Sequence, residues 1–290
     1  MRLAIASGKG GTGKTLLATG LAWVLAESGR GDVCLLDCDV EEPNDHLFLA
    51  PKIERWEQVS LPLPRIDAGL CTLCGRCAQV CAFHALALVP GKVLFFPQLC
   101  HGCGSCVLQC PEQAISESER PLGRLEFGQA GQIAFGRGVL AVGEALATPL
   151  IRRLKERAAA CLPARSLTLL DAPPGNACPV VETLRGSDFA ILVTEPTPFG
   201  LHDLQIAVEM ARDELRLPVG VVINRVGLGD EGVEAYCRAA GVPVLLRLPF
   251  DRRIAAAYAE GQLWVEALPE YRSALLALHE EVLDQVGALP

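Results

Sequence analysis

The stretch SGKGGTGKT at residues 7–15 constrains the fold of this chain more than any other segment. It fits the P-loop pattern GxxxxGK[ST], in which glycines turn consecutive backbone N–H groups toward phosphate oxygens. An apolar run at 2–7 precedes it, apolar residues at helical spacing follow over 14–28, and a second apolar run, VCLLD, lies at 33–37. This order predicts a strand, a phosphate-binding loop, a helix and a second strand, which is how a parallel α/β sheet begins.

The side chains of the loop predict a nucleotide with Mg²⁺ as its ligand. Lys14 can neutralise charge on the β- and γ-phosphates, and the Thr15 hydroxyl can bind Mg²⁺. The alternative is a glycine-rich turn without a ligand, and the strand before it and the helix after it argue against that. The expected nucleotide-binding residues of the loop are Gly8, Lys9, Gly10, Gly11, Thr12, Gly13, Lys14 and Thr15.

The second half of the chain resumes the α/β pattern. From residue 166 onward, short aliphatic runs alternate with stretches of helical periodicity, which suits strands buried on both faces. The sequence therefore predicts a P-loop NTPase fold with a mostly parallel sheet flanked by helices. The expected strands are SLTLLD, FAILVTE, PVGVVIN and VPVLLRLPF, and the expected helices lie near 178–186, 201–214 and 231–240.

A cysteine-rich segment separates these two halves. Residues 60–118 contain CTLCGRCAQVCAFHAL and LCHGCGSCVLQCPEQAI, two copies of one unit whose first cysteines, Cys71 and Cys100, are 29 residues apart. Each copy is too short to bury a hydrophobic core of its own, so something other than apolar burial must organise it. We expect an insertion over 60–118 within a nucleotide-binding domain made of residues 1–59 and 119–290.

The cysteine spacing predicts two [4Fe–4S] clusters. Each copy reads CxxCxxCxxxC, and Pro111 follows the second copy, which is the bacterial ferredoxin run whose fourth cysteine binds the other cluster. Zinc is the competing metal, but its sites use pairs of CxxC rather than three evenly spaced thiols in a duplicated unit. The expected ligand sets are Cys71, Cys74, Cys77 and Cys110 for one cluster and Cys100, Cys103, Cys106 and Cys81 for the other.

Composition excludes several classes of function. A net charge of −8 with only 3 Trp and 3 Tyr argues against nucleic acid as a partner, because such binding needs a basic surface and often stacking aromatics. No apolar run approaches the ~18 residues of a membrane span. The N-terminus shows no export signal, so we expect a cytoplasmic protein without disulfides. Of the other cysteines, Cys34, Cys38 and Cys237 are expected in the core. Cys178 is also expected to be buried, and the alternative is a thiolate ligand of a cluster that bridges two subunits.

The loop also carries a family resemblance. KGGTGK, with Lys9 as an additional lysine, resembles the deviant P-loop of the MinD, ParA and nitrogenase iron-protein group of ATPases. In that group the first lysine reaches the nucleotide of a partner subunit. The resemblance therefore implies ATP hydrolysis with Mg²⁺ by a homodimer that holds ATP at its interface. The acidic C-terminal segment departs from the basic membrane helix of MinD, so no membrane insertion is expected.

Three further segments resemble functional regions of the same group. LLDCDVEEPN resembles switch I, where Asp37 binds the cofactor and Asp39 lies by the attacking water. LLDAPPG resembles Walker B with switch II, where Asp171 holds the water shell of magnesium, and VVINR places Asn224 where the group reads adenine. Helix caps and a turn residue are the alternative interpretations. The residues expected to act in catalysis are Lys9, Lys14, Asp39 and Asp171.

These features predict an ATPase that also carries two low-potential clusters. The favoured function is ATP-gated electron transfer with an unidentified protein as electron donor or acceptor. Two alternatives stay open: a carrier or scaffold that delivers iron–sulfur clusters to other proteins, and a protein-positioning ATPase with structural or sensory clusters.

Overall fold

The computed structural model of this chain describes residues 1–29, 32–160 and 167–287. Within them, nine strands form one sheet in the order β11-β10-β9-β1-β8-β2-β7-β6-β3. The strands are β1 (Arg2–Ala6), β2 (Val33–Asp37), β3 (Lys52–Ile66), β6 (Ile115–Ala130), β7 (Ile133–Leu140), β8 (Leu167–Asp171), β9 (Phe189–Thr194), β10 (Val219–Val226) and β11 (Val244–Pro249). The pairings from β11 through β7 are all parallel, and β6 and β3 are added antiparallel at one edge.

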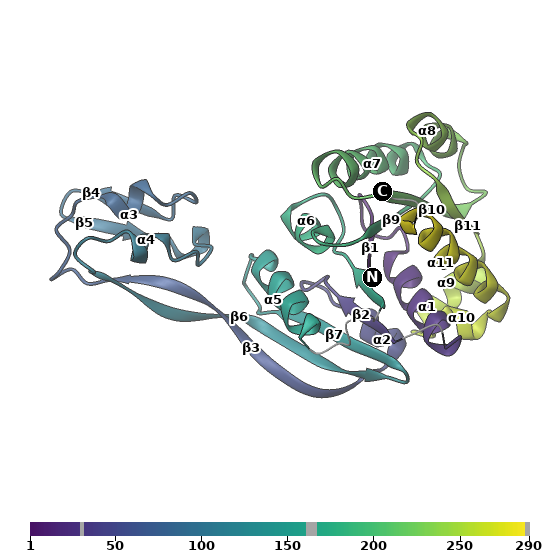
Figure 1. Cartoon of the computed structure of the whole chain (residues 1–290), viewed down its shortest axis with the longest axis horizontal. Helices are drawn as coiled ribbons and strands as arrows, with labels where there is room; N and C mark the ends of the chain where they lie inside the picture. Colours follow the sequence, from purple (N-terminus) through teal and green to yellow (C-terminus); the bar gives the residue numbers. More distant parts are fainter. Residues whose placement is uncertain (30–31, 161–166, 288–290) are drawn as a thin grey trace.

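Helices cover both faces of the parallel part, as the aliphatic strands predict (Figure 1). One core lies between the sheet and α1 (Lys14–Glu27), α9 (Arg252–Ala259), α10 (Trp264–Ala267) and α11 (Arg272–Gly287). The opposite core lies under α5 (Ala147–Ala159), α6 (Cys178–Leu184), α7 (Pro198–Val208) and α8 (Gly232–Ala240). The predicted mostly parallel sheet flanked by helices is confirmed. Cys34, Cys38 and Cys237 are buried as expected, whereas Cys178 is exposed at the first turn of α6, so that expectation was wrong.

A long two-stranded ribbon leaves the antiparallel edge of the sheet. β3 and β6 pair over their whole length, from Lys52 with Gln129 to Ile66 with Ile115, but β6 pairs with β7 only over 123–130. The remainder of β6, residues 115–122, and its partners in β3 project from the body as an arm (Figure 1). The expected boundaries after residues 59 and 118 fall inside these two strands.

The cysteine-rich segment lies at the far end of this ribbon (Figure 1). It contains α3 (Arg76–Gln79), the hairpin of β4 (Leu86–Val89) and β5 (Lys92–Phe95), the 3₁₀ turn Pro97–Leu99 and α4 (Ser105–Leu108). The two copies of the sequence unit also repeat in backbone conformation. Residues 29 positions apart share a positive φ: Leu73 (57°) and Gly102 (64°), Gly75 (76°) and Gly104 (71°), His84 (51°) and Gln113 (50°).

Candidate nucleotide and cysteine sites

The glycine loop lies between the end of β1 and the start of α1, at the edge of the sheet where parallel strands end. Gly13 has φ 100°, and a Cβ there would lie 2.4 Å from Asn224 Nδ2, so only glycine fits this close approach. Lys14 is the first residue of α1 and is buried. Burial lowers the pKa of Lys14, and the charges of Asp171 and Asp39 oppose that shift. The loop therefore presents a buried cation and a helix N-terminus to one site, as phosphate binding requires.

Asp171 stands at the end of β8, directly opposite Asp37 at the end of β2. The Thr15 hydroxyl donates a 2.7 Å hydrogen bond to Asp171 Oδ2, which joins the loop to the predicted Walker B strand. Burial raises the pKa of Asp171 to about 6. The structure thus brings Lys14, Thr15 and Asp171 together across 156 residues of sequence.

The segment after β2 turns back on Asp37. This carboxylate is fully buried and accepts N–H bonds from Asp39 (3.2 Å) and Asp45 (3.1 Å), so it fixes the turn between them. Burial, reinforced by the charge of Asp171, raises the pKa of Asp37 well above its usual range. Asp39 is half-buried, and burial raises its pKa while the charge of Lys14 lowers it. Asp39 therefore lies within electrostatic reach of the loop lysine.

Lys9, the additional lysine of the loop, is held by its own chain. Its Nζ lies 3.0 Å from Glu195 Oε2, and Arg225 pairs with the other oxygen of the same carboxylate. Glu195 follows β9 and is nearly buried, whereas a third of the Lys9 side chain is exposed. A lysine that reaches a partner subunit would have to leave this contact.

Glu195→Gln should release Lys9 and favour association. We expect dimers with a non-hydrolysable ATP analogue to form at about two- to five-fold lower protein concentration, since an ion pair whose lysine is partly exposed contributes only modestly. Sedimentation equilibrium measures this shift. Glu214→Gln, which changes an exposed carboxylate, is the matched control. Unchanged or weaker association of the Glu195 variant would contradict the expectation.

Asn224, expected to read adenine, lies on β10 against the loop. Its Nδ2 donates to the Thr12 carbonyl at 2.8 Å, and its Oδ1 accepts the Arg225 N–H at 2.9 Å. Both ends of the amide therefore brace the backbone in this structure. Contact with a base stays a prediction.

Two residues of this site were not predicted from the sequence, Asp45 and Glu195. Asp45 begins the short helix α2 (Asp45–Leu49) and is fully buried beside Asp37 and Asp171. Burial and these carboxylates raise its pKa well above the usual range. Their positions in the sequence could have indicated a role in the site. Each residue comes after a buried strand, at the edge of the sheet where ligands bind.

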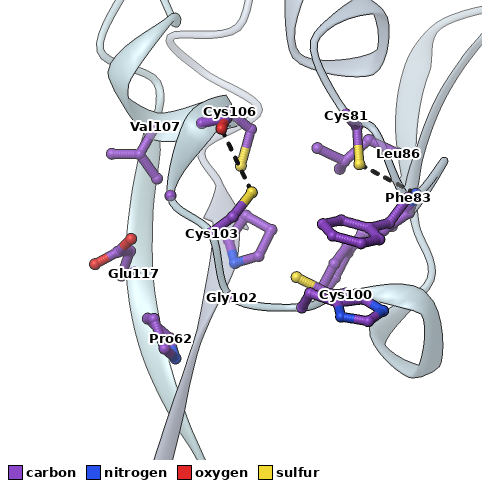
Figure 2. A pocket seen from close by; sticks show the side chains of 16 residues that line it. Pro62, Cys81, Phe83, Leu86, Cys100, Gly102, Cys103, Cys106, Val107 and Glu117 are labelled. Carbon is purple, nitrogen blue, oxygen red and sulfur yellow. Dashed lines mark hydrogen bonds between the residues drawn. The ribbon is translucent and has the colours of Figure 1, made fainter. Parts of the chain in front are cut away.

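The eight cysteines with the predicted cluster spacing, all in the cysteine-rich segment, line two separate cavities. Residues 100, 103 and 106 share one cavity with Cys81, which we call the proximal pocket because Pro62, Pro64 and Glu117 of the ribbon also line it (Figure 2). Residues 71, 74 and 77 share the other with Cys110; it lies farther along the ribbon, by Ile66 and Ile115, and we call it the distal pocket. In each pocket the fourth cysteine thus comes from the other sequence unit, which is the grouping that the spacing predicts.

Polar contacts to sulfur repeat between the pockets. The N–H of Ala85 donates to Cys81 Sγ at 3.2 Å, and the N–H of Ala114 donates to Cys110 Sγ at 3.3 Å. Cys103 Sγ lies 3.4 Å from Ser105 Oγ, and this contact lowers the pKa of the Cys103 thiol. Donors aimed at sulfur favour thiolate, the form that binds metal.

Among the described residues, no three His, Cys, Asp or Glu side chains are grouped closely enough to hold a metal ion. Each of the two cavities brings four cysteines together, and four thiolates are the ligand set of a [4Fe–4S] cluster.

The sheet and loop define a P-loop nucleotide hydrolase. A model of the CobQ/CobB/MinD/ParA nucleotide binding domain matches residues 3–264. The chain belongs to this family and is an ATPase; ATP and Mg²⁺ fit its site.

Known proteins resemble this chain at several levels. It is 28% identical over 283 residues to uncharacterized protein MJ0579 of Methanocaldococcus jannaschii, covering 92% of both chains. Over 137 residues it is 28% identical to a Culex quinquefasciatus protein described as a cytosolic Fe-S cluster assembly factor NUBP2 homolog, covering 41% of this chain and 52% of that one. The structure of septum site-determining protein MinD from Pyrococcus horikoshii with Mg-ADP has a TM-score of 0.59 at 21% identity, covering 97% of this chain and 95% of that one. This last likeness concerns the fold.

No helix within the described ranges is long and apolar enough to cross a membrane.

Proposed function

We propose that this ATPase gates electron transfer through two [4Fe–4S] clusters. In this proposal residues 1–59 and 119–290 form the ATPase domain, and 60–118 form an inserted ferredoxin-type domain. Two copies of the chain associate with ATP between them, and Lys9 and Lys14 act on the phosphates while Asp39 and Asp171 act on water and magnesium. A protein electron donor or acceptor docks on the inserted domain in the cytoplasm.

The cysteine pockets support the cluster assignment. Cys81, Cys100, Cys103 and Cys106 would hold one cluster, and Cys71, Cys74, Cys77 and Cys110 the other. A bound cluster supplies reversible uptake of one electron. The pockets themselves contribute thiolates, N–H donors to sulfur and backbone turns at Gly75 and Gly104 that let the chain wrap closely.

The observation that carries the gating proposal is a continuous set of contacts from switch I to the proximal pocket. Val40, next to Asp39, accepts the N–H of Leu140 at 2.8 Å at the end of β7. In the loop that follows β7, Glu144 pairs with Arg120 of the ribbon at 3.1 Å.

Arg120 completes the connection to the pocket. Its Nη1 donates to the Pro97 carbonyl at 3.0 Å, and the same carbonyl accepts the N–H of Cys100. One guanidinium therefore joins the loop after β7 to the turn that presents a proximal cysteine. A displacement of the switch I segment has a packed, polar route to this thiol.

The proposal predicts that nucleotide changes the proximal cluster and that Glu144 transmits the change. In anaerobic protein, Mg-ATP in place of Mg-ADP should shift its midpoint potential by about 40–130 mV, the equivalent of a typical 5–150-fold coupling between sites. Glu144→Gln should remove most of that shift without removing the cluster. Redox titration followed by EPR measures both.

The control is Glu156→Gln, which removes an exposed carboxylate paired with Arg153 on α5. The gating proposal fails if ATP changes neither the potential of either cluster nor the rate at which a chelator removes iron. A protein that lacks iron and sulfide after anaerobic purification would reject the clusters themselves.

A second candidate function is cluster delivery, favoured by the similarity to the Culex assembly factor. This similarity covers 41% of the chain. Incubation of ⁵⁷Fe-loaded protein with an apo-ferredoxin separates the two functions. Gating predicts that the label stays with this protein, whereas delivery predicts ATP-dependent transfer to the acceptor.

A further inference from the structure

Asp45 is the unexplained charged residue of the nucleotide site. Its side chain is fully buried, and neither carboxylate oxygen accepts a hydrogen bond from any described residue. Its carboxyl group is in direct contact with that of Asp171, and the charge of Asp37 acts on it more strongly than any other. Asp171 Oδ1 is also buried without a donor. Asp45 and Asp171 thus face each other with unsatisfied oxygens, beside Asp37, whose two oxygens accept N–H bonds.

Such an arrangement is stable only when a proton or a positive partner offsets the buried charges. Burying an unpaired carboxylate is strongly unfavourable, and neighbouring like charges add to the penalty. The positive charge of Lys14, in the phosphate loop, favours the charged forms of Asp171 and Asp39. The unsatisfied oxygens of Asp45 and Asp171 therefore fit a hydrated divalent cation. Magnesium suits them, because it prefers oxygen and keeps several of its waters.

We propose that Asp45 is a positioning residue for magnesium, which together with Asp171 and Thr15 orients the water shell of the ion. The Thr15 hydroxyl lies 2.7 Å from Asp171 Oδ2, so the three groups form one continuous oxygen surface. This role adds a residue from α2 to the P-loop and Walker B residues. It rests on the ATPase site alone and is independent of the cysteine pockets.

The position of Asp45 links the ion to switch I. Its backbone N–H donates to Asp37 Oδ2, and Asp39 lies between these two residues in the turn. A metal held through the Asp45 side chain would add to these backbone contacts and hold the 38–45 segment, which contains Asp39, more firmly beside the loop.

Asp45→Asn tests the proposal through metal binding. Titration of Mn²⁺ in the presence of ADP, followed by EPR, should show about 10–100-fold weaker binding, the usual loss when a supporting residue of a metal site is removed. Glu42→Gln, which changes an exposed carboxylate of the same turn, should bind Mn²⁺ like the unsubstituted chain. Equal Mn²⁺ affinity of the Asp45 variant would overturn the proposal and would fit a proton shared between Asp45 and Asp171.

A second measurement needs no variant. Hydrogen exchange of the peptide covering 38–49 should slow when Mg²⁺ is added to the ADP-bound chain, compared with ADP and EDTA. Exchange that does not respond to Mg²⁺ would also overturn the proposal. Loss of clusters leaves both readouts unchanged, so failure here is distinct from failure of electron transfer.

Discussion

Replacing Cys81 by alanine should remove the cluster of the proximal pocket and leave the distal cluster intact. Iron in anaerobically purified protein should fall from about eight to about four atoms per chain, because each four-iron cluster is lost as a unit. Cys81 belongs to the first sequence unit, yet it lies with Cys100 and Cys103 of the second unit. This variant therefore tests the crossed arrangement directly.

Double variants make the test sharper. Adding Cys103→Ala to Cys81→Ala should cause no further loss of iron, since both line the proximal pocket, whereas adding Cys74→Ala should remove nearly all iron. Cys178→Ala is the control, because Cys178 is an exposed cysteine outside the cysteine-rich segment. This variant should keep about eight iron atoms. The crossed arrangement is rejected if Cys81 and Cys74 prove to share one cluster.

Asp39→Asn should lower the rate of ATP hydrolysis by about 10²–10⁴-fold while nucleotide affinity changes little. This is the usual contribution of a side chain that orients or deprotonates the attacking water. The variant keeps the shape and one acceptor oxygen but loses the charge that faces Lys14. Steady-state phosphate release gives the rate, and equilibrium binding of a fluorescent ATP analogue gives the affinity.

Glu41→Gln, an exposed carboxylate two residues away, serves as the matched control for this variant and should hydrolyse ATP normally. A hydrolysis rate within a few fold of the unsubstituted chain would remove Asp39 from catalysis. Equal loss of binding and hydrolysis would instead assign it to nucleotide binding.

The parallel body could be predicted from the sequence because its signals are local. The glycine loop fixes β1 and α1, and fully apolar runs mark the strands buried on both faces. The ribbon could not be predicted, because much of β3 is exposed and its apolar residues do not alternate clearly. Pro62, Pro64 and Pro121 also argue against strands, yet Pro121 lies at a register shift, where proline is tolerated.

The residues of the candidate site also fall into those that the sequence predicted and those that it did not. The phosphate loop and the eight cysteines were predicted because each belongs to a short local pattern whose residue types and spacing indicate the chemistry. Glu195 was missed because its partner Lys9 is 186 residues away, and only the fold brings them together. Asp45 was missed because a single aspartate before an apolar stretch is also an ordinary way to begin a helix.

The projecting part of the ribbon has the form of a lever arm whose base is held by the Arg120–Glu144 pair. Residues 115–122, which β7 does not pair, span about 26 Å at the rise of a strand. A rotation of about 10° at its base moves its tip by about 4–5 Å over that length. Under the gating proposal, a small rotation near the nucleotide would therefore become a displacement of several ångströms at the cysteine-rich tip.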